Sequence, residues 1–351
     1  EDIPWESVSL EKKVDYARTI NKKNINAEKT IVDAITLLQH YKTYSLFVNR
    51  NRCLEQLIPR TEYICMVIMQ DGRKSSSLHI GKSKQGGYEN INISDKDREE
   101  MITDCKRLLY ADRIEPGTYD VIFDPEFSGI FAHEAFGHGT ETDQFLKKRS
   151  KGEEYLGKKV ASELVNMYDS PVVENASASF IFDDEGFLAS ETEIIKNGIL
   201  QRGITDGYSG YKLNLKRTAN GRRQSYANKA YSRMTNTYFG LGSNTLEEML
   251  ASIESGYLLR HPSNGMEDPK GWGIQLEGYY VEEIKEGKLT GKVFSPVIVT
   301  GYVPDLLESI SMVGDEIAIS GLGFCGKGHK EWVKVTDGGP YLKLEYSNIY
   351  E

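Results

Sequence analysis

Two histidines and a glutamate in the stretch FAHEAFGHGTETD (Phe131–Asp143) are suited to metal chemistry. Glu134 follows His133 directly, and His138 comes five residues after His133. Zinc peptidases commonly carry two histidines four residues apart on a helix, with a glutamate after the first histidine as general base. The spacing here is HExxxH instead. The stretch is therefore either a metal site with a longer spacing or a polar loop in which two histidines happen to be neighbours.

The longer spacing restricts the backbone that can carry such a site. Residues i and i+5 lie roughly 140° apart around a regular α-helix, so His133 and His138 would face different sides. A π turn, which closes from i to i+5, brings them onto one face, and such turns are frequent at functional sites. We expect the distortion at Gly137, because glycine has a permissive backbone. The preceding YDVIFDP predicts a strand followed by a helix, with Asp124 as N-cap and Pro125 as its first residue.

A zinc site of this kind needs a third protein ligand and leaves one position for water. The candidates are Glu141, Asp143, Cys325 and His329. The two carboxylates follow His138 too closely to return to the metal without a sharp turn, although either can orient a ligand. Cys325 lies in GLGFCGKGH, where flanking glycines indicate a tight loop, and we favour it over His329.

Composition excludes several classes of protein. A net charge of −9 over 351 residues argues against nucleic-acid binding, which normally needs a basic surface. The longest apolar stretch, VFSPVIVTGYV, is too short to span a bilayer and is interrupted by Pro296 and Gly301, so we expect no membrane partner. Four scattered cysteines do not form a disulfide framework, which favours a reducing, cytoplasmic setting.

Periodicity predicts an α+β fold. We expect a helix from Leu10 with Ser9 as N-cap, strands in YSLFVNRNR and EYICMVIMQDGRKSSSLHIGK with a hairpin turn at Asp71-Gly72, and a helix over residues 97–110. Cys53, Cys65 and Cys105 lie in segments that are expected to form strand or helix core. Beyond residue 160, runs such as SASFIFDD read as strands, and a capping box at Thr245 and Glu248 begins a helix that Gly256 stops.

These elements predict two domains. A small helix-and-antiparallel-sheet domain is expected at residues 1–115, and a larger β-rich domain carrying the metal-binding helix at residues 116–351, with RIEPGTYD as the boundary. Within the second, NGRRQSYANKAYSRMTNTY holds Arg222 and Arg233. These arginines either face substrate or brace the loop by bonding backbone carbonyls, and the sequence does not decide between the two.

Six blocks of this chain resemble the TldD/PmbA family of metallopeptidases. The blocks HEAFGHGTETD, GKKVASEL, NGRRQSYA, RMTNTY, ISMVGDEIAI and GFCGKGH occur in the order found in that family, and the HExxxH motif is similar to its catalytic, TldD-like branch. Residues 8–90 resemble the family's middle segment, so the chain is expected to lack the family's N-terminal segment.

The resemblance implies a specific site and activity. His133, His138 and Cys325 are expected to hold one Zn²⁺ per chain, which iron(II) could replace, with Glu134 as the catalytic carboxylate. The expected enzyme is a cytoplasmic peptidase acting on unfolded or flexible peptides. Its expected partner is a second copy, or a TldE/PmbA-like paralogue, in a dimer.

Two other functions remain open from the sequence. One is a non-catalytic peptide-binding subunit of a heteromeric TldD/TldE-like complex, which loss of the motif would favour. The other is a dipeptidyl peptidase III type exopeptidase, because HEAFGH also fits HExxGH; its second acidic metal motif is not evident in this sequence.

Overall fold

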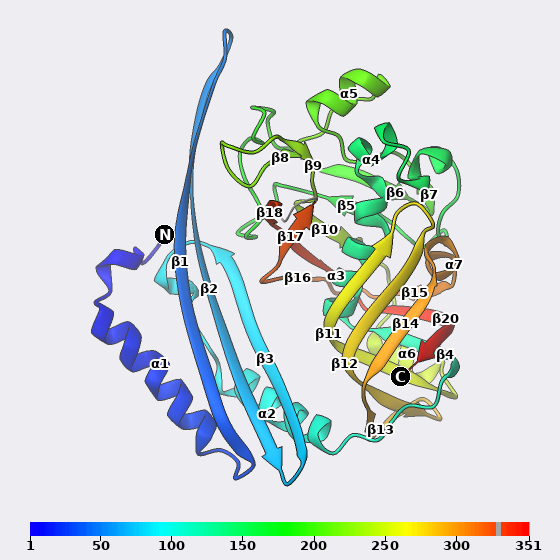
Figure 1. The fold of residues 1–351 in the computed structure, drawn as a ribbon. Helices are drawn as coiled ribbons and strands as arrows, with labels where there is room; N and C mark the ends of the chain where they lie inside the picture. The colour runs from blue at the N-terminus through cyan, green and yellow to red at the C-terminus, as the bar shows by residue number, and fades with distance from the viewer. Residues whose placement is uncertain (328–330, 351) are drawn as a thin grey trace. The chain divides into compact units, whose positions relative to one another are not determined.

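The computed structural model describes residues 1–327 and 331–350 (Figure 1). Two compact units make up the chain. The first comprises Glu1–Ser45, Gln56–Asp112 and Asn175–Ser177, and the second comprises Leu46–Glu55, Arg113–Glu174 and Ala178–Glu351. Helices and strands are mixed in the chain, which confirms the α+β class. The domain boundary near residue 115 stays our proposal, and His329 lies outside the described residues.

The first unit is built on an antiparallel sheet in the order β1-β2-β3. Its elements are η1 (Trp5–Ser7), α1 (Leu10–Ile25), β1 (Ile31–Val48), β2 (Cys53–Asp71), β3 (Lys74–Gln85), η2 (Tyr88–Asn90) and α2 (Asp95–Leu109). Ser9 caps α1 by accepting from the Lys12 N–H at 3.3 Å, and Asp71 pairs with Lys74 across the hairpin turn. The predicted cap and hairpin are thus confirmed.

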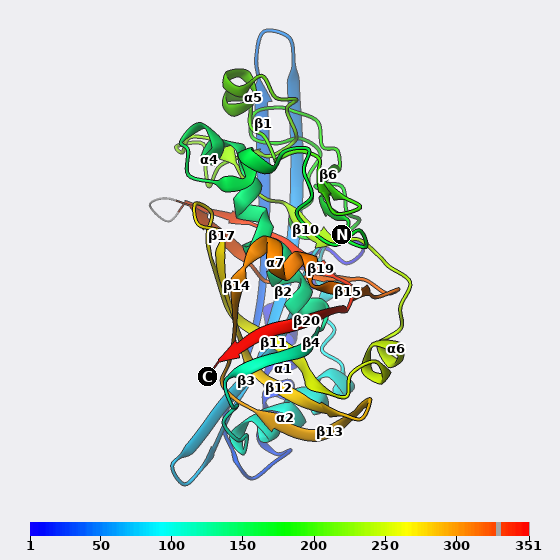
Figure 2. The ribbon, with the colours of Figure 1, turned by 90° about the vertical axis from the view of Figure 1, so that its right-hand side faces the viewer.

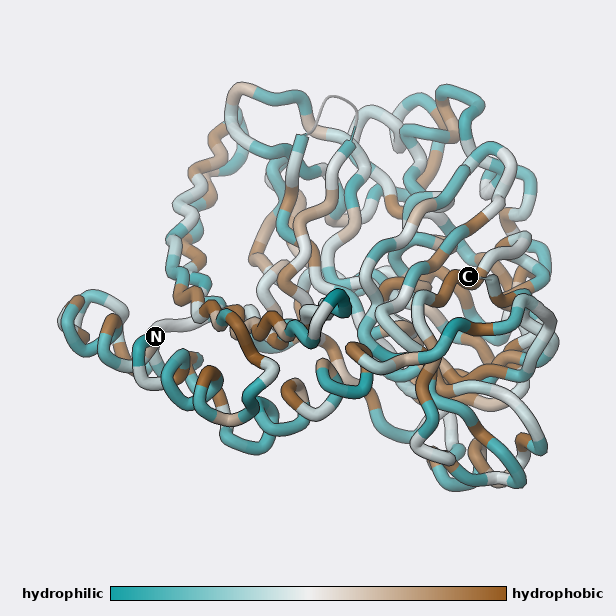
Figure 3. The backbone as a smooth tube through the Cα atoms, turned by 60° about the horizontal axis from the view of Figure 1, so that its bottom comes forward, coloured by the Kyte–Doolittle hydropathy of each residue, from teal (hydrophilic) through white to brown (hydrophobic). Residues whose placement is uncertain are grey.

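Alternation along β2 gives the sheet one apolar face. Cys65, Val67 and Met69 are buried, and Cys105 of α2 packs beside them. Asn24 of α1 donates to Cys65 Sγ at 3.1 Å, so both helices use this face. Along α1 and α2, hydrophobic and hydrophilic residues alternate within each turn, as expected of helices that are covered on one side (Figure 3). Cys65 and Cys105 are core residues as predicted.

The second unit contains two sheets. One has the order β11-β4-β20-β14-β12-β13, with β15 beside β20, and β11 also pairs with β12; Figure 2 shows β4 and β20 side by side. Its strands are β4 (Gly117–Phe123), β11 (Ser255–Asp268), β12 (Gly273–Lys285), β13 (Lys288–Phe294), β14 (Val297–Tyr302), β15 (Ile310–Val313) and β20 (Leu342–Tyr350). The other has the order β16-β19-β10-β5-β6-β7: β5 (Met167–Asp169), β6 (Thr192–Lys196), β7 (Ile199–Leu200), β10 (Asn236–Phe239), β16 (Ala318–Ser320) and β19 (Thr336–Gly339).

Short helices and two hairpins complete this unit. The helical segments are α3 (Pro125–Phe131), η3 (Ala132–Gly137), η4 (His138–Thr140), α4 (Thr142–Leu146), η5 (Lys151–Tyr155), α5 (Gly207–Leu213), α6 (Leu246–Ala251) and α7 (Val303–Glu308). The hairpins are β8 (Gly221–Arg222) with β9 (Tyr231–Ser232), and β17 (Phe324–Lys327) with β18 (Glu331–Lys334). Helix α3 contacts strands of both sheets, including β11 and β19, so the larger core surrounds it.

Three local predictions were wrong. SASFIFDD is not a strand: Asp183 Oδ1 accepts from the Glu185 and Phe187 N–H groups, and this side-chain turn replaces strand pairing. The capping box begins α6 as predicted, but that helix ends at Ala251 because Gly256 already belongs to β11 and pairs with Asp120. Cys53 is exposed rather than packed in the core.

No helix within residues 1–327 or 331–350 combines the length and the apolar character that crossing a membrane requires.

Candidate metal centre

The helix that carries the histidines begins and distorts where the sequence predicts. Asp124 Oδ1 accepts from the Phe127 N–H at 2.8 Å, and Pro125 is the first helical residue. Helix α3 then passes into a π turn over Ala132–Gly137. The predicted cap and π turn are confirmed.

Aromatic packing fixes this helix in the core. Phe127, Phe131 and Phe136 are fully buried. The Phe131 ring meets Phe123 edge-on with centroids 5.5 Å apart, and the Phe136 ring lies 5.4 Å from Trp272. Each buried phenylalanine contributes roughly 2 to 3 kcal/mol through loss of apolar contact with water. The backbone that presents the histidines is therefore held on several sides.

The predicted reason for a glycine at position 137, its permissive backbone, is wrong. Its φ of −59° is an ordinary helical value, so the π turn does not need a permissive backbone there. A Cβ at this position would instead run into the side chain of Met234. Packing, rather than conformational freedom, explains the glycine.

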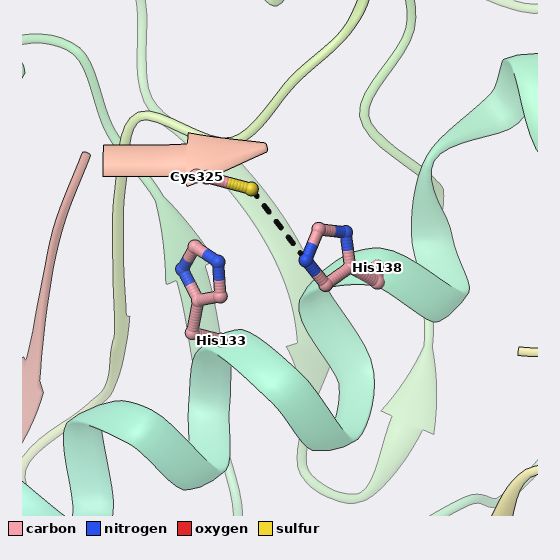
Figure 4. Close-up of side chains that lie close together, drawn as sticks. All are labelled: His133, His138 and Cys325. Carbon is pink, nitrogen blue, oxygen red and sulfur yellow. Dashed lines mark hydrogen bonds between the residues drawn. The ribbon is translucent and has the colours of Figure 1, made fainter. Parts of the chain in front are cut away.

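The structure brings His133, His138 and Cys325 together (Figure 4). One ligand atom from each lies within 4.8 Å of the other two, and Cys325 Sγ is 3.5 Å from His138 Nε2. The two imidazole rings are nearly perpendicular, with centroids 5.1 Å apart. Both histidines project from the same stretch of helix, and Cys325 reaches them from strand β17 (Figure 4).

Cys325 lies on a strand rather than in the predicted tight loop. It pairs with Val333 of β18 and is 6% exposed. Arg233, itself fully buried, donates from Nη2 to the Cys325 carbonyl at 2.6 Å and from Nη1 to the Glu331 carbonyl at 3.0 Å. Arg222 likewise donates to backbone carbonyls, those of Met234 and Lys334. For these two arginines the bracing interpretation is confirmed.

Two residues of the helical stretch are partly accessible to solvent. Within residues 131–140, Glu134 and His138 are half-buried and the other residues are buried. These two side chains are therefore the most accessible ones in this stretch.

The thiolate of Cys325 and the positive charges of the two imidazoles stabilise one another. Burial alone would lower the pKa of both imidazoles, but the Cys325 thiolate outweighs it, raising the pKa of His133 to about 9 and that of His138 well above its usual range. Burial would raise the pKa of Cys325, yet His138 and His133 hold it well below that of an ordinary thiol. Cys325 is thus set up as a thiolate beside a positive charge, which is the form that binds a cation.

The donor set matches a known type of metal site. Two imidazole nitrogens and one thiolate converging from a helix and a strand fit the three protein ligands of a catalytic zinc site, which keeps a further position open. Imidazole and thiolate together also suit iron, so the donors favour a transition metal over Mg²⁺ or Ca²⁺.

Glu141 and Asp143 do not belong to this set of three. Glu141 Oε2 instead lies 3.2 Å from His138 Nδ1, the orienting position considered for it from the sequence. Burial opposes ionisation of Glu141, but Lys327 and then His138 prevail and hold its pKa at about 2. Lys327 was not singled out from the sequence, because a lone lysine between glycines carries no local signal.

Glu267, at the end of β11, was also missed. Both of its carboxylate oxygens are buried, and neither has a hydrogen-bond partner in the described part of the chain. Burial raises its pKa well above the usual range; His138 opposes this, and the nearby Glu134 and Glu141 reinforce it. Burial therefore disfavours a negative charge on Glu267 beside the cluster.

Comparison with known proteins identifies the family. Residues 116–350 match the model of the PmbA/TldA metallopeptidase C-terminal domain. A metalloprotease of Methanothermobacter thermautotrophicus is 31% identical over 308 residues, which cover 87% of this chain and 67% of the relative. The chain belongs to the PmbA/TldD family of metallopeptidases.

Other members of the PmbA/TldD family extend the comparison. A zinc metalloprotease TldD homologue of Saccharolobus solfataricus is 37% identical over 237 residues, covering 65% of this chain and 51% of the relative. A putative modulator of DNA gyrase from Thermotoga maritima superposes with a TM-score of 0.81 at 18% identity, over 99% of this chain and 76% of that one. TldE from Thermococcus kodakarensis gives 0.75 at 17% identity, over 96% and 74%. The two structures share the fold of this chain.

Proposed function

We propose that this chain is a zinc-dependent metallopeptidase of the HExxxH type that hydrolyses unfolded or flexible peptides. His133, His138 and Cys325 hold the metal, and Glu134 is the general base. The observation that carries the proposal is the convergence of three ligand atoms within 4.8 Å, next to a half-buried glutamate on the same helix.

Zinc is the proposed ion. The donors suit it, and a relative of this chain is named a zinc metalloprotease. A zinc ion held by these residues supplies Lewis acidity, which polarises a peptide carbonyl and acidifies water.

The remaining steps belong to the chain's own groups. The Glu134 carboxylate accepts a proton from the attacking water and passes it to the leaving amine nitrogen. Glu134 follows His133 on the helix and is half-buried, so its carboxylate is accessible to water and substrate. The buried Arg233 holds Cys325 by its carbonyl, which keeps the thiolate in place while the peptide binds.

We also propose that the chain works in the cytoplasm as a dimer, with a second copy or with a TldE/PmbA-like paralogue. Support comes from membership of the family. Sedimentation at micromolar concentration, alone and with the paralogue, tests it; a monomer under both conditions contradicts it.

Replacing Glu134 by Gln tests the activity. The variant should keep stoichiometric metal and lose peptide hydrolysis by about 10²- to 10⁴-fold, because the amide cannot accept the proton. Glu126→Gln is the matched control, since Glu126 is an exposed carboxylate on α3 at 55% side-chain exposure.

The outcomes separate the candidate functions. Loss of metal in Glu134→Gln would make Glu134 a ligand, and activity within a few-fold of the parent would remove it as the base. Metal-loaded parent protein that binds peptides without cleaving them would favour the non-catalytic peptide-binding subunit.

A further inference from the structure

A buried cluster of charges lies between the segment that follows His138 and the strand that carries Cys325. Lys327 Nζ is 2.9 Å from Glu141 Oε2, 2.6 Å from Asp143 Oδ1 and 2.8 Å from the Ser232 carbonyl oxygen. The side chains of Lys327, Glu141 and Asp143 are 10%, 1% and 7% exposed. All three protons of the ammonium group therefore have an acceptor.

A buried cluster of charges contributes little net stability to a fold, because its ions must be removed from water. Removing an ammonium and two carboxylates from water costs several kcal/mol per ion, and well-packed apolar side chains often stabilise as much or more. Buried ion pairs with defined geometry can instead specify one arrangement of the elements that they join. In this protein, the elements joined by the cluster are the ones that carry His138 and Cys325.

The cluster joins the two elements that carry the metal ligands. Lys327 follows Cys325 by two residues on β17, so the two side chains project from the same face of that strand. Glu141 follows His138 by three residues. Its Oε2 atom lies both 2.9 Å from Lys327 Nζ and 3.2 Å from His138 Nδ1. One carboxylate oxygen thus contacts both His138 and Lys327, which lies on the same strand as Cys325.

The same oxygen determines which histidine nitrogen can bind a metal. A proton on His138 Nδ1 donates to Glu141, which leaves the lone pair on Nε2. Nε2 is the atom 3.5 Å from Cys325 Sγ. Lys327 Nζ, 2.9 Å from the same oxygen, holds Glu141 in place for this hydrogen bond.

Arg233 supports the connection from the other side. Its Nε lies 3.8 Å from Glu141 Oε1, and its Nη2 donates to the Cys325 carbonyl. Glu141 therefore has a cation near each oxygen, and both cations also reach the strand that carries Cys325.

We infer that Lys327 is a positioning residue: by bridging Glu141 and Asp143 it holds the Cys325 strand against the helix and prearranges the His133, His138 and Cys325 donors for a metal ion. The inference rests on the proposed function of these three residues as ligands.

The test compares Lys327→Met with Lys147→Met. Lys147 pairs with the other oxygen of the same Asp143, at 2.9 Å, but its side chain is 45% exposed. Both variants lose one positive charge and keep a long side chain. Residues 1–351 are freed of metal by chelation, and cobalt(II) binding is then measured by competition with a chelator. The thiolate-to-cobalt absorption band reports whether Cys325 is a ligand.

Lys327→Met should bind cobalt 10- to 100-fold more weakly and show a diminished thiolate band. Lys147→Met should stay within threefold of the parent with the band intact. Equal loss in both variants would reveal a general effect of charge and overturn the inference. Parent-like affinity and band in Lys327→Met would overturn it as well.

Two further results keep the test decisive. If far-UV circular dichroism shows that Lys327→Met is unfolded without metal, Glu141→Gln replaces it; the amide oxygen still accepts from His138 but carries no charge to hold the ammonium. Parent-like affinity in that folded variant overturns the inference. If the parent itself binds cobalt without a thiolate band, Cys325 is not a ligand, and the proposed function fails independently of Lys327.

Discussion

Gly265 on β11 lies directly against the side chain of Glu134. A Cβ at residue 265 would stand 2.5 Å from Glu134 Cγ and 3.2 Å from Ile130 Cδ1. The backbone of β11 therefore forms a wall beside the proposed base, and a residue without a side chain lets the carboxylate occupy its position.

Gly265→Ala should displace Glu134 without touching the metal ligands. Because a shift of about 1 Å in a reacting group costs up to 10²-fold in rate, we expect kcat/KM to fall roughly 10- to 100-fold while metal content stays stoichiometric. Gly273→Ala on the neighbouring strand is the control, since a Cβ there meets nothing within 4 Å. Unchanged peptide hydrolysis in Gly265→Ala would count against Glu134 as the base in this conformation.

Gly137→Ala should destabilise the π turn through its contact with Met234. Overpacking a core costs about 1 to 3 kcal/mol, and we expect a comparable drop in the free energy of unfolding together with weaker metal binding. The same substitution should cost less in a Met234→Ala background, where the sulfur is absent. Urea denaturation of the four metal-free proteins measures this coupling. Equal costs in both backgrounds would show that Met234 is not the obstacle.

Cys325 should be protected from alkylation by bound metal. In the metal-loaded protein, iodoacetamide should modify the exposed Cys53, while Cys65 and Cys105 stay buried; chelation should add Cys325, whose low pKa makes it nucleophilic. Peptide mass spectrometry locates the label.

Cys325→Ser should weaken metal binding severely and leave the fold intact. His329→Ala is the companion variant. If Cys325→Ser keeps stoichiometric metal while His329→Ala loses it, His329 is the third ligand instead.

Asp124→Asn should change how stability depends on pH. Burial, followed by repulsion from Glu126, raises the pKa of Asp124 to about 7, against about 3.9 in an unfolded chain. The folded protein therefore holds a proton that the unfolded chain releases, and stability is lost as pH rises from about 4 through 7. Asparagine can still accept a hydrogen bond from the Phe127 N–H, but its side chain has no proton to release in this pH range.

The two proteins should accordingly have similar melting temperatures near pH 4 and diverge by pH 8. We expect Asp124→Asn to gain roughly 2 kcal/mol relative to the parent over that interval, less than the full shift because the N-terminus of α3 attracts a negative charge. Thermal unfolding at several pH values measures it. A difference independent of pH would mean that Asp124 is ionised throughout.

Local rules were sufficient for the elements that carry the histidines. Asp124 and Pro125 begin α3 as capping preferences require. The spacing of His133 and His138 could serve one metal only through a π turn, and that turn is present. Each of these features depends on residues fewer than six positions apart.

The rest of the site depends on contacts between distant residues. Lys327 acquires its role only when β17 meets Glu141, and Gly265 only when β11 passes Glu134. No periodicity or motif in the sequence announces either contact. The reason for Gly137 could not be predicted either, because its contact with Met234 joins residues that are far apart in the sequence. In SASFIFDD, apolar alternation was outweighed by the hydrogen bonds of a single aspartate.

The separation of 187 positions between His138 and Cys325 sets an order of events during synthesis. At roughly 5 to 20 residues per second, the cysteine leaves the ribosome about 10 to 40 seconds after the second histidine. Until then, the nascent chain offers the two histidines of the proposed metal site but not Cys325, and an ion bound by the histidines alone can exchange freely. Once the cysteine arrives, a bound ion acts as a cross-link that closes this loop, and closing a loop of that size removes roughly 5 kcal/mol of unfolded-state entropy. Chains that stall before the cysteine should therefore remain open to proteolysis, while completed and loaded chains resist it.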